Sequence, residues 1–420
     1  MQKKWWKKYL SLCRKLLKKI NSSNLYLILL ILTSLKIILS FYLGDHVIVE
    51  EWAILRDNLI EKNTFSYHYI DGENIPSVYM PPLYAYFIYL ISILDFNEFV
   101  TVKIILIFQC ILSGISIIYF FKILKKFFNE KISLYFSLIY FLYPLNFYSA
   151  TQISSVSIQV SLFIFFLYFY LKAVNHTDFF LLGLFSGLMT LIRGEFWLLL
   201  IILFLFKIFK KKFSFKNFFV TLVSIFIIIT PYLIRNYINF NQIILTKSSG
   251  YNLWRGNSKT FNINGEHQDT KQITDFKFEL QKKLIERNQL NKYEILIDEY
   301  YLSVAQENIL KEPTKYLIHY FKKAFAFIFF NPFSNYPNYY NPLVFIPEII
   351  ISIIAAIGFF RNLFSTQRNL EIILITMYYL SLIPIFFVLP RYKLFVLPLY
   401  FIFAAYFLTF LSNKIFSKKQ

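Results

Sequence analysis

The stretch LYLILLILTSLKIILSFYLGDHVIVEEWAILRDNLIEKN, residues 25 to 63, joins an apolar run to an acidic one. The apolar run, Leu25 to Leu43, has nineteen residues, enough for a helix to cross about 30 Å of hydrocarbon. The next twenty residues contain five carboxylates, and charged groups are costly inside a bilayer. The stretch therefore predicts a membrane span that leads directly into a segment in water.

The rest of the chain has the same apolar character. Of its 420 residues, 57% are hydrophobic and 16% are charged, which no water-soluble domain of this size matches. We predict an all-α integral membrane protein with about 11 to 13 transmembrane helices. The further apolar runs cover residues 82 to 94, 99 to 121, 132 to 147, 152 to 172, 178 to 192, 194 to 209, 217 to 234, 317 to 330, 343 to 360, 370 to 389 and 393 to 411.

Charge predicts the orientation. The first twenty residues hold eight Lys or Arg and no acid, so the positive-inside rule places the N-terminus in the cytoplasm. No small-residue cleavage motif follows the first apolar run, so we expect a retained anchor. The net charge of +20 is explained by Lys and Arg reaching lipid headgroups, and we expect no nucleic acid partner. High Lys, Asn, Ile and Phe usage favours a bacterium, and thus a multi-pass protein of the inner or plasma membrane.

Two polar segments, 44–81 and 237–316, hold seven and ten of the 24 acids and are not expected to cross the membrane. Phe276, Leu280 and Leu284 are spaced by four residues, which predicts a helical lobe in the second. We divide the chain into a basic cytoplasmic N-terminus (1–24), an N-terminal transmembrane catalytic module with its exterior loop 44–81 (25–236), an exterior helical loop (237–316) and C-terminal transmembrane helices (317–420).

Several classes of site are absent from the sequence. Ten glycines form no GxGxxG, GxxxxGK[ST] or GxSxG motif, so nucleotide binding is not expected. The two cysteines, Cys13 and Cys110, form no CxxC pair. The five histidines form no HxH or HExxH pattern typical of zinc.

The acidic stretch itself predicts an amphipathic helix on the membrane surface. Ile48, Trp52, Leu55 and Leu59 recur at spacings of four, three and four, so they share one helical face. The acids on its other faces, Glu51 among them, either contact substrate or simply form a solvated surface. Both interpretations stay open for these acids.

Asp45 differs because it follows the end of the first span by two residues. A carboxylate fixed at the border of a low-dielectric region is partly desolvated, which raises its pKa toward a value useful for a general base. We therefore expect Asp45 to be catalytic. The alternative is one more acid that solvates an exterior loop.

The order of these and later motifs resembles the GT-C superfamily of polytopic membrane glycosyltransferases. The nearest branch is that of protein O-mannosyltransferases and lipid A aminoarabinose transferases. The motifs that carry the resemblance are Asp45 with Glu51-Trp52-Ala53, Pro81-Pro82-Leu83-Tyr84, Tyr143-Pro144, Gly183 to Glu195, Pro231 to Tyr237, Gly250 to Asn257 and Arg391 to Pro398.

The resemblance implies transfer of a sugar from a polyprenyl-phosphate donor to a lipid, glycan or protein acceptor on the outer side of the membrane, with inversion. A base must deprotonate the acceptor, and cations must stabilise the departing phosphate. Asp45 is the candidate base. Guanidinium groups match phosphate geometry; the candidate substrate-binding residues are Glu51, Asp71, Glu73, Tyr84, Arg235, Asn252, Trp254, Arg255, Asn257, Arg391 and Lys393.

Each of these candidates has a plainer explanation. The cations are equally typical of side chains reaching a lipid headgroup, and Trp254 of an interfacial anchor. Arg193 and Glu195 could pair with each other. Met80 stands where a Lys often precedes the double proline in the aminoarabinose branch, which argues against that particular substrate. A divalent metal ion held by Asp45 and nearby acids is an open alternative to a reaction without any cofactor.

Two other function classes remain. A transporter or flippase of lipid-linked sugars usually has internal repeats and broken polar helices near the bilayer midplane, whereas here the acids gather in exterior segments. A surface polysaccharide polymerase or ligase shares the long exterior loop, but the arrangement of Asp45 and Pro81-Pro82 is not expected in it.

Overall fold

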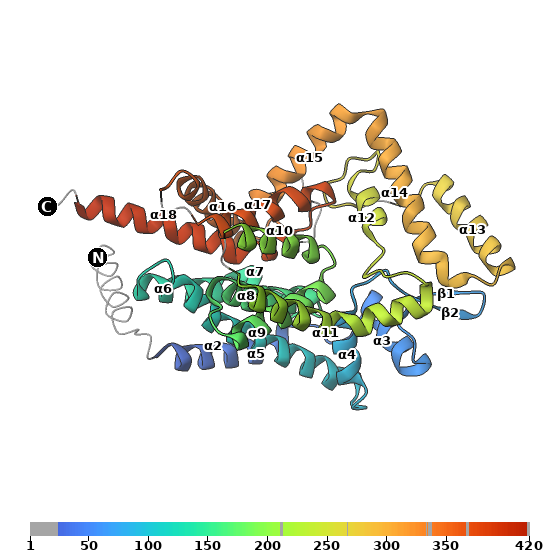
Figure 1. Cartoon of the computed structure of the whole chain (residues 1–420), viewed down its shortest axis with the longest axis horizontal. Coiled ribbons are helices and arrows are strands. Elements are labelled where there is room, and N and C mark those ends of the chain that lie inside the picture. The colour runs from blue at the N-terminus through green and yellow to red at the C-terminus, as the bar shows by residue number, and fades with distance from the viewer. Residues whose placement is uncertain are drawn as a thin grey trace, which may run out of the picture.

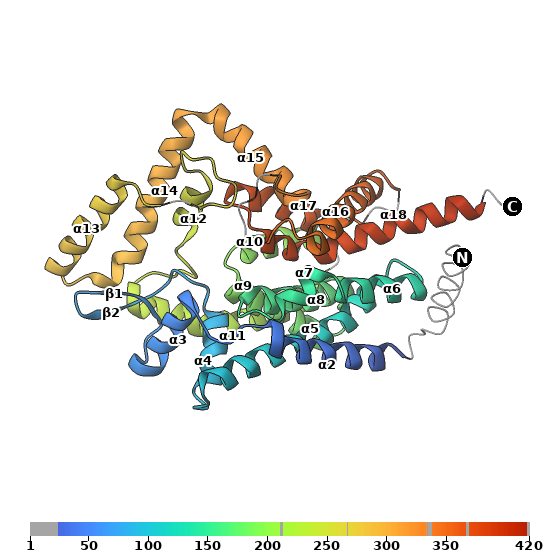
Figure 2. The same ribbon diagram turned by 180° about the vertical axis from the view of Figure 1, so that it is seen from behind.

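The structure is a computed structural model that describes residues 24–210, 213–266, 268–332, 334, 338–366 and 369–417. The predicted basic N-terminus, with Cys13, lies outside these residues except for Asn24, and so do the last three residues of the chain. Most of the helices run roughly parallel to the long axis of the molecule (Figure 1). The end of α18 lies at one end of this axis, and a lobe of helices projects at the other (Figures 1 and 2).

The N-terminal half forms one group of helices. Its first span, exterior helix and second span are α2 (Leu25–Leu43), α3 (Glu50–Lys62) and α4 (Pro82–Ser92). Between α3 and α4 lie two short strands, β1 (Ser66–Ile70) and β2 (Glu73–Pro76). The group continues with α5 (Glu98–Leu124), α6 (Glu130–Phe141), α7 (Pro144–Ser149), α8 (Ser155–Lys172), α9 (His176–Ile192), α10 (Phe196–Phe209) and α11 (Phe215–Phe240).

The lobe and the C-terminal helices follow. The lobe contains α12 (Ser249–Gly256), α13 (Lys271–Glu286), η2 (Leu290–Lys292) and α14 (Tyr293–Lys311), and α15 (Pro313–Ile328) returns the chain from it. The last group is α16 (Pro342–Leu363), α17 (Leu370–Leu382), η3 (Ile383–Ile385), η4 (Pro390–Phe395) and α18 (Leu397–Ser417). In Figures 1 and 2 this last group lies alongside the N-terminal helices, on the same side of them as α15.

Five of the described helices are long and apolar enough to cross a membrane: α2, α5, α8, α11 and α16. Five shorter apolar helices accompany them, so the expected membrane protein is confirmed, while the number of crossings stays a prediction. In α8, 83% of the apolar window is buried inside the protein, against 22% in α2 and in α11. Helix α8 is therefore central, and α2 and α11 present most of their surface outward.

Small residues allow α9 and α11 to approach closely. A Cβ atom on Gly183 would lie 2.4 Å from the Thr221 carbonyl oxygen, and one on Gly187 would lie 2.7 Å from Ile228 Cβ. Small residues four positions apart are typical of tightly packed membrane helices. The break at Arg193, Gly194 and Glu195 then separates α9 from α10. These three residues are half-buried inside the molecule.

Helix α3 confirms the predicted amphipathic segment, with Leu55 and Leu59 buried. Ile48 is buried too, but the helix begins only at Glu50, so Ile48 does not belong to the helical face predicted for it. Leu55 and Leu59, with half-buried Trp52, pack against Phe65 and other protein side chains. This part of the face is therefore covered by protein, and only the membrane-surface position of the helix stays a prediction.

The hairpin of β1 and β2 is the exception in a nearly all-α fold, and it lies within the segment 44–81 predicted as an exterior loop. Its two strands pair antiparallel, and its turn places Asp71 at φ 51° and Gly72 at φ 81°. An Asp-Gly pair between two short runs is a known hairpin signal, because both residues tolerate positive φ. The sequence contained this signal.

The lobe confirms the predicted helical character of residues 237 to 316. Leu280 and Leu284 of α13 are buried against α14, together with Trp254 of α12, Ile297 and Tyr301. Gly250 lets α12 lie against α14, since a Cβ there would be 2.0 Å from the Asp298 carbonyl oxygen.

A candidate active site between the lobe and the helix bundle

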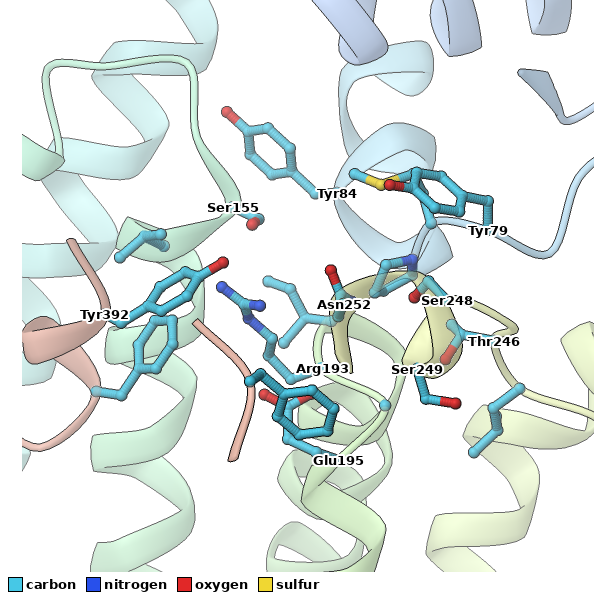
Figure 3. Close-up of a pocket in the computed structure, with 18 of the residues that line it drawn as sticks. Tyr79, Tyr84, Ser155, Arg193, Glu195, Thr246, Ser248, Ser249, Asn252 and Tyr392 are labelled. Carbon is cyan, nitrogen blue, oxygen red and sulfur yellow. The ribbon is translucent and has the colours of Figure 1, made fainter. Parts of the chain in front are cut away.

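A cavity of about 710 Å³ lies where the lobe meets the helix bundle. It is lined by α3, the segment before α4, the start of α8, the break between α9 and α10, the segment before α12, α12 itself, and residues 382 to 395. These segments are far apart in the sequence. Figure 3 shows that their side chains point into one space.

Three guanidinium groups line the cavity: Arg193, Arg255 and Arg391. Arg193 points into the space between Tyr392 and Asn252 (Figure 3). Its Nε donates to Gln159 Oε1 at 2.8 Å, and the group stacks on Phe395, 4.6 Å from the ring centroid. These contacts fix the plane of the guanidinium. In the part of the chain that the structure describes, its two terminal nitrogens make no hydrogen bond.

The guanidinium of Arg255 is held by the same two kinds of contact as that of Arg193, whereas Arg391 has neither among the described residues. Arg255 Nε donates to the Gly265 carbonyl oxygen at 2.8 Å, and its guanidinium lies 4.5 Å from the Phe387 ring centroid. Arg391 belongs to η4 and is exposed to the cavity. No ion pair joins any of these three arginines to an acid within the described ranges.

Two carboxylates, Glu51 and Glu195, line the same cavity. Burial raises the pKa of Glu51, and the nearby charge of Arg391 opposes that rise. The alternative that Arg193 and Glu195 pair with each other is not observed between these two described residues, and Arg193 bonds Gln159 instead. Glu195 accepts a hydrogen bond on its backbone oxygen from the Tyr378 hydroxyl at 2.5 Å.

Asp45 lies behind the cavity wall. Its Oδ2 accepts a hydrogen bond from the Ile153 backbone N–H at 2.6 Å, and its backbone oxygen accepts one from Lys103 Nζ at 2.9 Å. Ser154 and Ser155, the residues that follow Ile153, line the cavity, and Asp45 itself is not among the lining residues. Its Oδ1 has no hydrogen-bond partner in the described structure, so one oxygen of this half-buried carboxylate is available.

Of the other predicted residues, Tyr84 and Asn252 reach the cavity (Figure 3). The Tyr84 hydroxyl donates to Gln109 Oε1 at 2.9 Å, so this residue offers the cavity its ring rather than a free hydroxyl. Asp71 and Glu73 lie at the exposed turn of the hairpin and are not brought to the cavity.

Arg235 fastens α11 to the first exterior loop. Its Nη1 donates to the Ser77 carbonyl oxygen at 2.6 Å and to Asn236 Oδ1 at 2.8 Å, and its Nη2 donates to the Phe65 carbonyl oxygen at 2.9 Å. Arg235 is thus occupied by protein and does not line the cavity.

Trp254, Asn257 and Lys393 are also placed elsewhere. Trp254 is buried in the lobe core. Asn257 accepts a hydrogen bond from Lys323 Nζ and donates to two backbone carbonyls. Lys393 is buried in an ion pair with Glu348, with 2.6 Å between Nζ and Oε1. The charge of Lys393 is neutralised there.

Several lining residues were not among the predicted site residues, among them Trp52, Tyr79, Met80, Ser155, Arg193 and Tyr392. Arg193 could have been predicted from the sequence. A charged residue between two apolar runs is energetically costly, and such a cost usually indicates a function. As for the open question of a divalent metal, the described residues contain no group of three or more His, Cys, Asp or Glu that could hold one.

Comparisons with known proteins agree with this architecture. Residues 79–234 match the family model described as dolichyl-phosphate-mannose-protein mannosyltransferase. No curated protein matches the sequence. The Archaeoglobus fulgidus oligosaccharyltransferase, solved with a tethered acceptor peptide containing the NVT sequon, is 12% identical with a TM-score of 0.52, over 94% of this chain and 50% of that chain.

Two further structures are similar. The same archaeal enzyme, AglB, in complex with an inhibitory peptide and a dolichol-phosphate, gives 12% identity and a TM-score of 0.52, over 93% of this chain and 51% of that one. ArnT of Cupriavidus metallidurans, bound to undecaprenyl phosphate, gives 10% and 0.42, over 92% and 77%. The predicted resemblance to GT-C membrane glycosyltransferases is confirmed at the level of the fold, and this chain spans about half the length of the archaeal enzyme.

Proposed function

We propose that this protein transfers a sugar from a polyprenyl-phosphate carrier to a lipid, glycan or protein acceptor at the extracytoplasmic face of a bacterial inner or plasma membrane. The observation that carries the proposal is the cavity with three guanidinium groups, none of which forms an ion pair with an acid among the described residues. The family match over residues 79–234 supports it, as does the dolichol-phosphate named with the archaeal enzyme of the same fold.

The donor phosphate is assigned to the arginines. Arg193 and Arg255 are each fixed through Nε and an aromatic ring, so their terminal nitrogens are pre-oriented. Fixed donors of this kind stabilise charge that develops on a departing phosphate, because the protein does not have to reorganise during the reaction. In this proposal Arg193 and Arg255 bind the phosphate in place of the Lys that often precedes the double proline in the aminoarabinose branch, where this chain has Met80.

The apolar side of the cavity suits the carrier chain. Leu233, Ile243, Ile244 and Leu245 line it, and Ile243 is 76% exposed. An isoprenoid chain can therefore run along apolar side chains from the cavity toward α11, which presents most of its surface outward.

Asp45 is proposed as the base in an inverting displacement. The acceptor hydroxyl oxygen forms a bond to the anomeric carbon from the face opposite the phosphate, and the phosphate leaves with the electrons of the old bond. The proton of the hydroxyl passes to the free Oδ1 of Asp45. Because Asp45 lies behind Ser154 and Ser155, this step requires the acceptor hydroxyl to reach past these two lining residues. Glu51, whose pKa is raised by burial, lies inside the cavity and is proposed to bind the acceptor.

Two variants of the reconstituted protein test the proposal, with a labelled polyprenyl-phosphate sugar as donor. Asp45→Asn should abolish the release of polyprenyl phosphate, while Glu51→Gln should mainly raise the KM for the acceptor. If Asp45→Asn turns over normally and Glu51→Gln is inactive, the base is Glu51 and our assignment is wrong. Movement of the donor across the membrane without its consumption would instead indicate a flippase.

A further inference from the structure

A second hollow, of about 400 Å³, lies between the C-terminal ends of α5 and α8. Helix α6, which begins just after α5, marks this end of the molecule, opposite the lobe (Figure 1). The hollow has a basic rim and a largely apolar floor. Its lining consists of Lys122, Ile123, Lys125, Lys126, Tyr168, Leu171 and Lys172, with no acidic residue.

Two of the ammonium groups gather on one aromatic ring. Lys122 Nζ lies 5.7 Å from the centroid of Tyr168, and Lys172 Nζ lies 5.5 Å from the same centroid. The electron-rich face of an aromatic ring attracts a cation at such a distance. Lys122 Nζ also lies 5.0 Å from the centroid of Tyr119, which does not line the hollow. Two like charges are thus held beside Tyr168 at the hollow, although like charges repel each other.

The protein neutralises little of this charge. Lys125 lies 3.8 Å from Glu130, and both side chains are nearly half exposed, so the pair contributes little. Lys126 donates from Nζ to the Leu171 carbonyl oxygen at the end of α8, which is a usual contact for a cation at a helix C-terminus. That explanation covers Lys126 but not Lys122 and Lys172. The ammonium group of Lys122 lies against the rings of Tyr119 and Tyr168, and that of Lys172 lies against Tyr168.

The position of the hollow selects the ligand. Helices α5 and α8 are both long and apolar enough to cross the membrane, and both end here. Ile123 and Leu171 are buried beneath the lysines. An anion that fits must carry its charge at the depth where two spans leave the hydrocarbon, and must have an apolar part next to it. A phospholipid headgroup has both.

We propose that the Lys122/Lys172 hollow binds the phosphate diester of an anionic membrane phospholipid. The lysines supply charge and the apolar floor receives the upper part of the lipid. The hollow shares no lining residue with the candidate active site, so this inference does not rest on the proposed transferase function.

The test uses the full chain in detergent, titrated separately with phosphatidylglycerol, phosphatidylcholine and inorganic phosphate. Native mass spectrometry counts bound lipid and a thermal melt follows stabilisation. We expect phosphatidylglycerol to bind at least tenfold more tightly than phosphatidylcholine, and Lys122→Ala/Lys172→Ala to weaken it about tenfold or more. The control, Lys131→Ala/Lys210→Ala, removes the same charge outside the hollow and should bind as the parent does.

Three outcomes would overturn the inference. Equal loss in both double variants would show unspecific surface electrostatics. Stabilisation by inorganic phosphate to the same extent would show a site for a free anion. Equal affinity for the two lipids would show no charge recognition. If the alanine variant does not fold, Lys122→Arg/Lys172→Arg and Lys122→Gln/Lys172→Gln decide the matter, because only the first should retain binding.

Discussion

Arg235 and Arg391 have the same side chain but opposite surroundings. The donors of Arg235 are taken by the Ser77 and Phe65 carbonyls and by Asn236. Arg391 is exposed in the cavity and forms no ion pair within the described ranges. Lys393, two residues after Arg391, is buried against Glu348. A cation can serve a ligand only where the fold leaves its donors unoccupied, so these residues should respond differently to substitution.

The largest effect is expected at the buried pair. Lys393→Met leaves Glu348 buried without a partner and should lower the free energy of unfolding by about 3–5 kcal/mol. Unfolding in detergent measures this. Lys393→Met/Glu348→Leu should recover most of the loss, because it removes both charges. If Lys393→Met alone were as stable as the parent, the pair of Lys393 and Glu348 would be solvated and not buried.

The cavity arginines should affect turnover more than stability. Arg391→Ala or Arg193→Ala should lower kcat/KM for the polyprenyl-phosphate donor about 100-fold, since each removes one donor to the developing phosphate charge. The melting temperature of Arg391→Ala should stay unchanged, whereas Arg193→Ala also removes the hydrogen bond to buried Gln159 and should lower it slightly. Arg235→Ala is the matched control and should do the reverse, with a loss of about 1–3 kcal/mol in stability and normal kcat/KM in the folded fraction. Equal kinetic losses at Arg235 and Arg391 would contradict the comparison.

Glu294 should make stability depend on pH. One of its oxygens accepts bonds from the Val78 and Tyr79 N–H groups and the Ser77 hydroxyl, and burial raises its pKa from 4.5 to about 7 despite the opposing charge of Arg235. The folded protein binds this proton more tightly. Its stabilising contribution is therefore full below about pH 4.5 and is lost as pH rises through about 7.

His68, the other titratable group beside this carboxylate, has its pKa lowered by burial and acts in the opposite direction. The decline in stability from pH 5 to pH 8 should thus be clearest in His68→Gln, and Glu294→Gln should remove it in thermal melts at graded pH. A His68→Gln protein whose stability is flat or rises over that range would contradict the burial of Glu294.

The smallest effect is expected at the hairpin turn. Asp71→Asn and Glu73→Gln change exposed side chains that are not brought to the cavity. Each should alter stability by less than about 0.5 kcal/mol and leave kcat/KM unchanged. A clear kinetic loss in either variant would show that the hairpin moves onto the cavity during turnover.

The sequence determined the features that depend on local pattern. A largely apolar run of nineteen residues specifies α2, and the spacing of Leu55 and Leu59 specifies the buried face of α3. The same holds for Leu280 and Leu284 in α13. Helical periodicity places such residues on one face whatever the rest of the chain does. The hairpin could also have been predicted, because Asp71-Gly72 carries its turn chemistry.

Only the tertiary structure decided which charges are free. Arg235 is bound by a carbonyl 158 residues away, Glu294 by an N–H group 216 residues away, and Lys393 by a carboxylate 45 residues away. Asp45 is likewise set behind the cavity wall by Ile153, 108 residues later. Local spacing carries no information about partners at such separations. Those partners alone determine whether a charged side chain is free to bind a ligand or is already bonded within the protein.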